Sequence, residues 1–190
     1  SLNGSQIGLV NVAITHPRGV QIGLVNYTRD TIANKIGLVN INPNTRIDFM
    51  AFGGTSSKIN GALRFRNRST YSIIGFGSHY MGLDTKFSGA IYYRLGQYVN
   101  LSPRLSLSGD VGYYHIETFD GDSDNPERLH SLQAHINADY QINPTLGLYA
   151  SVGYGDTRFY AHNRHYKNGF IGQLGLTFKY NRGNSSDTHF

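Results

Sequence analysis

The segment Leu129–Ile142 has the sequence LHSLQAHINADYQI, in which two kinds of side chain alternate. One set is mostly apolar and the other is polar: His130, Leu132, Ala134, Ile136, Ala138, Tyr140 and Ile142 against Ser131, Gln133, His135, Asn137, Asp139 and Gln141. Successive residues of a β-strand point to opposite faces, so the pattern predicts a strand with one apolar and one polar face. The segment is also much longer than the five or six residues typical of strands in soluble proteins.

The same alternation continues in the segments on either side. Leu105, Leu107, Val111 and Tyr113 oppose Ser106, Ser108, Asp110 and Gly112, and Leu146, Leu148, Ala150, Val152 and Tyr154 form a further apolar set. In a transmembrane β-barrel the apolar set faces lipid and the polar set faces the lumen. We therefore expect six side chains to face lipid: Leu132, Ile136, Leu148, Val152, Leu174 and Leu176. Aromatic residues near the strand ends are expected to form interfacial girdles: Tyr98, Tyr113, Tyr140, Phe159, Phe178 and Tyr180.

The composition agrees with an all-β chain and argues against several other classes. The 190 residues include 23 Gly, 14 Tyr and 10 Phe but no Trp and no Cys, which favours strands and excludes disulfides and thiolate metal sites. No apolar run approaches the roughly 18 residues of a membrane-spanning helix. The basic residues behind the net charge of +5 are scattered along the chain, and RFRNR at Arg64–Arg68 is their only cluster. We expect no nucleic-acid partner and no cofactor, and basic residues near lipid head groups instead.

A repeat occupies the first forty residues. QIGLVN occurs at Gln6–Asn11 and Gln21–Asn26, and KIGLVN follows at Lys35–Asn40, at spacings of 15 and 14 residues. A membrane-spanning strand of about 9 to 11 residues plus a turn fits this period. We therefore predict a single antiparallel up-and-down barrel over residues 1–180, with the repeats of residues 1–42 as its first strands and a periplasmic tail at 181–190. A β-solenoid with one repeat per coil is the alternative.

The number of strands follows from the turn signals and from parity. Ten turn signals imply eleven strands, whereas single-chain bacterial barrels have even counts with both termini in the periplasm. We predict twelve strands, one of them preceding Ser1, or ten if Ile47–Phe52 and Ile59–Arg66 are wrongly divided. Barrels place short turns in the periplasm, so Asn143-Pro144 would lie there and the longer Phe119–Arg128 connection outside.

Two stretches resemble known bacterial sequences. The segment Gln173–Tyr180 resembles the β-signal of outer-membrane proteins, with Gln173, Gly175, Phe178 and Tyr180 at its defining positions. This resemblance implies insertion by the barrel-assembly machinery. The repeats at the start of the chain resemble a bacterial family of outer-membrane proteins with Gln-x-Gly-Leu-x-Asn surface repeats. That resemblance implies a location in the outer membrane of a Gram-negative cell.

The polar faces supply the candidate functional residues. The set predicted to face the lumen is Arg94, Asp110, Gln133, His135, Asp139 and Lys179, which would form either a paired network that plugs the barrel or the wall of a narrow pore. We expect a structural, accessory-subunit or surface-binding role in the outer membrane, with lipid and an outer-membrane protein as partners. The alternatives are a lipid-active enzyme and a soluble β-sandwich or solenoid surface protein.

An enzyme finds little support in the sequence. HExxH, GxSxG and P-loop motifs are all missing. His130 and Ser131 are adjacent on a predicted strand, so they point to opposite faces and cannot act as base and nucleophile. His115 and Glu117 share a face, but the sequence places no serine beside them. We therefore predict no catalytic residues and no metal ligands.

Overall fold

The computed structural model describes residues 6–13, 20–29, 34–80, 87–119 and 128–180. These residues form short strands near the start of the chain and long strands after it. The short strands are β1 (Gln6–Ile7), β2 (Val10–Ala13), β3 (Val20–Ile22), β4 (Val25–Thr28), β5 (Asn34–Ile36) and β6 (Val39–Ile41). The long strands are β7 (Arg46–Gly54), β8 (Ser57–Arg66), β9 (Thr70–Tyr80), β10 (Phe87–Asn100), β11 (Leu105–Phe119), β12 (Arg128–Gln141), β13 (Leu146–Phe159) and β14 (His165–Tyr180). None of the described residues forms a helix long and apolar enough to cross a bilayer.

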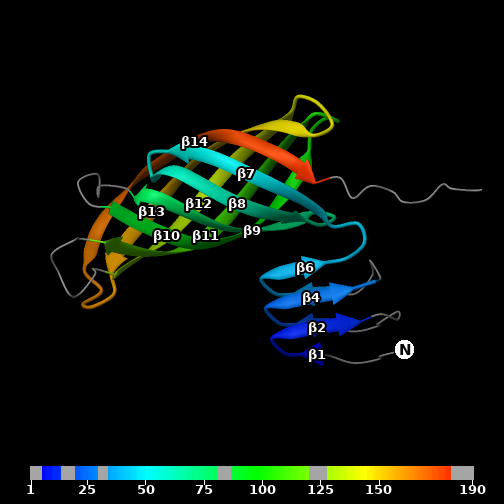
Figure 1. Ribbon diagram of the computed structural model, residues 1–190, viewed down its shortest axis with the longest axis horizontal. Coiled ribbons are helices and arrows are strands. Elements are labelled where there is room, and N and C mark those ends of the chain that lie inside the picture. Colours follow the sequence, from blue (N-terminus) through cyan, green and yellow to red (C-terminus); the bar gives the residue numbers. More distant parts are fainter. Residues whose placement is uncertain (1–5, 14–19, 30–33, 81–86, 120–127, 181–190) are drawn as a thin grey trace, which may run out of the picture.

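The long strands form a closed antiparallel barrel (Figure 1). Each strand from β7 to β14 pairs with the next, and β14 returns to pair with β7, from Gln173 opposite Gly54 to Tyr180 opposite Ile47. Closure leaves no strand with an unpaired edge, which removes the usual route to edge-to-edge aggregation. The predicted all-β, antiparallel up-and-down barrel is confirmed, and a sandwich of two open sheets does not describe this chain.

The predicted strand number was wrong, because the barrel has eight strands and not ten to twelve. The segments suspected of being wrongly divided are genuine barrel strands, β7 and β8. Eight is an even number, so β7 begins at the same end of the barrel at which β14 finishes (Figure 1). The odd count arose because the repeats were included as barrel strands.

The repeats lie outside the barrel, which corrects the prediction that residues 1–42 supply barrel strands. They form two parallel three-stranded sheets, β1-β3-β5 and β2-β4-β6, and so correspond to the alternative of a solenoid with one repeat per coil. Parallel pairing sets identical residues opposite one another, as with Asn11, Asn26 and Asn40. Their amides form a ladder in which Asn11 donates to Asn26, and Asn26 to Asn40, both at 2.9 Å.

The repeat glycines explain the close approach of the coils. A Cβ atom on Gly23 would lie 2.1 Å from the carbonyl oxygen of Gly8, and one on Gly37 would lie 1.9 Å from that of Gly23. Both distances are far below van der Waals contact, so only glycine fits. The glycines therefore recur because the coils of the solenoid stack closely, and not because they lie at the same depth in successive strands of a barrel.

The two faces of the barrel strands are assigned correctly by the alternation. The six side chains predicted to point outward do so, with exposures from 38% for Leu176 to 71% for Leu174. Tyr113, Tyr140, Phe178 and Tyr180 also point outward. Tyr98 and Phe159 correct the girdle prediction, because both pack against the buried side chains inside the barrel. The predicted tail at 181–190 lies outside the described residues.

Candidate functional site: the polar lumen of the barrel

An ion pair on neighbouring strands lies at the centre of the lumen. Arg94 on β10 donates to Asp110 on β11 through Nε and Nη2, both at 2.7 Å, and neither side chain is exposed to solvent. The Tyr71 hydroxyl and the Asn137 amide also donate to Asp110, at 2.6 and 2.7 Å. His135 Nδ1 lies 3.1 Å from the same carboxylate. A two-pronged guanidinium contact with further donors is the geometry that a buried carboxylate requires.

The hydrogen bonds of this central cluster extend from one side of the barrel to the other. Asn137 on β12 accepts from Arg94 and from the Tyr149 hydroxyl of β13, both at 2.9 Å. Tyr71 comes from β9, so each of the five consecutive strands from β9 to β13 contributes at least one member, and β12 contributes both His135 and Asn137. The cluster thus joins strands that are far apart around the barrel and occupies the space between them.

A second ionic cluster lies nearer the end at which β7 begins. Arg64 on β8 donates to Asp48 on β7 at 2.9 Å and to Asp139 on β12 at 3.0 Å, which connects opposite walls. Arg66 donates to Asp139 at 2.7 Å, and Arg46 donates to Asp48 at 2.8 Å. Arg64, Arg66 and Asp48 are all buried. Two carboxylates therefore hold three guanidinium groups across this part of the lumen.

Aromatic side chains fill much of the remaining lumen. The rings of Tyr92 and Tyr114 stack with centroids 4.7 Å apart, and Phe52 contacts Tyr149 at 5.3 Å. Leu129 and other buried apolar residues belong to the same core. The inside of the barrel is therefore packed with side chains.

The predicted lumen residues all lie on the inner face of the barrel, but they do not form one network. Arg94, Asp110 and His135 meet in the central cluster, and Asp139 belongs to the second cluster. Gln133 is buried beside Ser131, to which its amide donates at 3.3 Å. The sixth, Lys179, is only half-buried at the mouth nearest the start of β7.

Sequence reasoning missed seven members of the clusters: Arg46, Asp48, Arg64, Arg66, Tyr71, Asn137 and Tyr149. A signal for two of them was present, because Arg64 and Arg66 are two residues apart and therefore share a face of β8. Asn137 stood on the polar face that the alternation predicted. Sequence alone did not indicate which polar residues on distant strands meet.

The rim at the end of the barrel opposite the start of β7 carries a polar and aromatic group. His115 Nε2 and Arg128 Nε each lie 3.2 Å from Glu117 Oε1. The Tyr160 ring contacts the rings of His115 and His130. Ser131 is fully buried on the inner face, so it does not meet His130. Within the described part of the chain, no three His, Cys, Asp or Glu side chains gather as a metal site.

The four residues of the β-signal resemblance lie along the seam where β14 closes on β7. Gln173 and Gly175 face inward, whereas Phe178 and Tyr180 are exposed on the outside. A Cβ on Gly175 would lie 2.3 Å from the Ala51 carbonyl oxygen, so a larger residue would push the two strands apart. Recognition by assembly machinery remains a prediction.

A shallow apolar depression of about 480 Å³ marks the outer wall over β11 to β14 and β7. Its large apolar side chains are Leu107, Ile136, Val152 and Leu174, and Gly53 and Gly172 leave the space between them. Its lining offers little for polar chemistry and suits hydrocarbon.

No family model matches the chain, and no curated protein sequence matches it significantly. Among solved structures, a de novo designed transmembrane β-barrel is similar at 14% identity and a TM-score of 0.48, over 71% of this chain and 95% of that one. The N-terminal barrel domain of Pseudomonas aeruginosa OprF is similar at 10% identity and a TM-score of 0.47, over 72% and 96%. Neisserial surface protein A is similar at 13% identity and a TM-score of 0.45, over 71% and 94%.

Proposed function

We propose that this protein is an integral outer-membrane barrel that acts as a structural anchor or accessory subunit and does not conduct solutes. The outer wall supports the membrane location. On β11 the outward positions are apolar or glycine from Leu105 to Tyr113, and His115 and Glu117 follow. At about 3.4 Å per residue and a tilt of about 40°, the nine residues of that apolar stretch span roughly 23 Å, close to the belt of about 25 Å in known barrels.

The observation that carries the non-conducting role is the pair of ionic clusters in the lumen. Arg94 and Asp110 have no solvent-exposed side-chain surface, and Arg64 bridges Asp48 and Asp139 across the barrel. In a water-filled pore these side chains would be hydrated and exposed. Their burial and pairing instead match a plug, because buried charges require partners within the protein.

The same clusters support a structural role. They connect strands that are not neighbours in the sheet, such as β8 and β12, and so add bonds that ladder pairing does not provide. The solenoid is attached where β7 begins, at the end with the short turns, which barrels place in the periplasm. The protein would thus hold a periplasmic solenoid at the membrane, available to an envelope partner.

Conductance in planar bilayers tests this proposal. The purified chain is reconstituted and recorded in concentrated KCl beside a known porin as the positive control. We expect no unitary current steps from the wild type. The matched variant R94A/D110A removes the central pair and should increase ion leakage, which shows that reconstituted barrels are present in the bilayer. Regular steps from the wild type would refute the plugged lumen.

A further inference from the structure

The solenoid exposes a row of large apolar side chains. Each coil makes a bend between its two strands, formed by Gly8-Leu9, Gly23-Leu24 and Gly37-Leu38. The large apolar residues exposed at and beside these bends are Ile7 (79%), Leu9 (73%), Val10 (65%), Ile22 (40%), Leu24 (48%) and Leu38 (37%). Because the coils stack in register, these side chains form one continuous apolar stripe along the edge of the solenoid.

Two hydrogen bonds place this stripe relative to the barrel. The Asn67 amide, in the short turn between β8 and β9, donates to the Asn40 carbonyl at 3.0 Å. The Tyr93 hydroxyl, on the outward face at the middle of β10, donates to the Leu38 carbonyl at 3.0 Å. Leu38 therefore lies further from the short-turn end of the outer wall than Asn40 does. The separation is roughly 7 Å for two residues at about 3.4 Å each.

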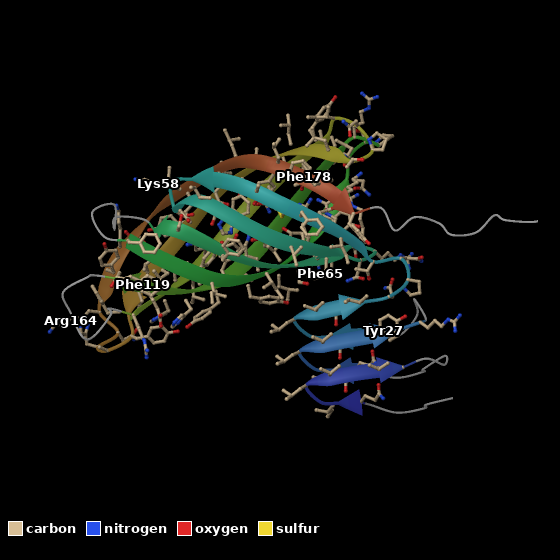
Figure 2. All side chains as sticks on the ribbon, viewed as in Figure 1. Tyr27, Lys58, Phe65, Phe119, Arg164 and Phe178 are labelled. Atoms are coloured by element: carbon tan, nitrogen blue, oxygen red, sulfur yellow. The ribbon has the colours of Figure 1, made fainter. Side chains whose placement is uncertain are left out.

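The bends of the solenoid lie on its side nearest the body of the barrel (Figure 1). In Figure 1 the arrows of β2, β4 and β6 point away from the body of the barrel, so the bends that precede them lie on the barrel side of the solenoid. The coils stack across the barrel axis and not along it. Figure 2 places Phe65 on the wall beside the solenoid and Tyr27 away from the bends. The stripe thus lies level with the apolar belt at its short-turn border.

The other edge of the coils carries a charged side chain. Arg29 follows β4, at the end of that strand furthest from the bend, and is exposed. A coil with one apolar and one charged edge is suited to a membrane surface. The barrel wall beside the stripe is apolar as well, since Ile74, which pairs with Tyr93 across β9 and β10, is 38% exposed.

We propose that the solenoid lies flat on the periplasmic leaflet, with the Ile and Leu side chains of its bends inserted among the lipids. This inference rests on the proposed membrane-spanning barrel. Lipid is the occupant that continuity favours, because the stripe extends the belt sideways at the border of the hydrocarbon layer. A depth of roughly 7 Å lies within the 5 to 10 Å to which interfacial elements bury their apolar faces.

Single-cysteine labelling tests the inference, and the chain is suited to it because it has no native cysteine. Variants L24C, R29C and I136C are labelled with a bimane fluorophore and reconstituted in phosphatidylcholine vesicles with or without brominated acyl chains. L24C reports on the stripe, R29C on the charged edge, and I136C on the barrel belt. L9C replaces L24C if the latter fails to fold.

We expect bromine to quench L24C to a degree comparable with I136C and to leave R29C unquenched. Quenching at I136C without quenching at L24C would overturn the solenoid inference alone, as would a blue-shifted L24C emission without quenching, which indicates contact with protein such as a second copy. A lack of quenching at I136C in a folded barrel would instead overturn the membrane-spanning function.

Discussion

Removal of the Asp110 carboxylate is the most direct test of the central cluster. In D110A, the Arg94 guanidinium loses both of its 2.7 Å bonds to the carboxylate while its side chain remains unexposed. Breaking a buried ion pair in this way costs about 3 to 5 kcal/mol, because a charge is left without its partner. Tyr71 also loses its acceptor, so we expect a loss of unfolding free energy toward the upper part of that range. Few proteins have more than about 15 kcal/mol in total.

The double variant R94M/D110L separates the charge from the packing. It replaces both members of the pair by apolar side chains, and such exchanges are often neutral or stabilising. We therefore expect the double variant to be more stable than D110A, although it carries two substitutions. This non-additivity is the signature of a pair that acts as one buried unit.

Urea unfolding in phospholipid vesicles measures these free energies. The chain has no Trp, so far-ultraviolet circular dichroism is the better readout, with electrophoretic mobility of the folded barrel as a second. A loss below about 1 kcal/mol for D110A, the value of an exposed pair, would refute the buried cluster. The same holds if the loss of unfolding free energy in R94M/D110L equals the sum of the losses measured for R94M and D110L separately.

The remaining predictions concern the outer wall, the solenoid and the closing seam. I136R should cost about 2 to 4 kcal/mol in the same urea assay, and a cost near zero would show that Ile136 does not face the middle of a bilayer. G23A should expose the solenoid to proteolysis while the barrel stays resistant, whereas G8A, whose new Cβ would lie 3.1 Å from one flexible side chain, should not; equal cleavage would contradict the stacking. G175A should lower the yield of folded barrel in unassisted refolding, because its Cβ would meet the β7 backbone, and G172A, which has open space, is the control. Equal yields would argue against a tight seam.

The residues of the lumen show how much the alternation of polar and apolar side chains can predict. The period of two placed Ile136 outside and His135 inside without any knowledge of the fold, because neighbouring strand residues must point to opposite faces. It also placed Arg94, Asp110 and Asp139 inside. It did not predict that Asp139 pairs with Arg64, since that contact depends on which strands face each other across the lumen.

The repeat shows where sequence reasoning stopped. A spacing of 14 or 15 residues fits both a strand with its turn and one coil of a solenoid, so period alone does not separate them. The identity of the repeats was the better signal. An antiparallel hairpin sets the start of one motif against the end of the next, whereas parallel stacking sets Asn11 on Asn26 and Gly8 beside Gly23, where identical residues complete the ladder and permit close approach.

By itself, the sequence determined the strands, the two faces of each and the class of the fold, because these depend on local geometry and on periodicity. Tertiary structure alone decided that eight strands close the barrel, that the repeats stay outside it, and that Arg64 and Arg94 pair with carboxylates of other strands inside it. Those outcomes depend on the pairing of β14 with β7 and on contacts between residues distant in the chain. Such contacts are set by the free energy of the whole closed sheet and leave no local pattern.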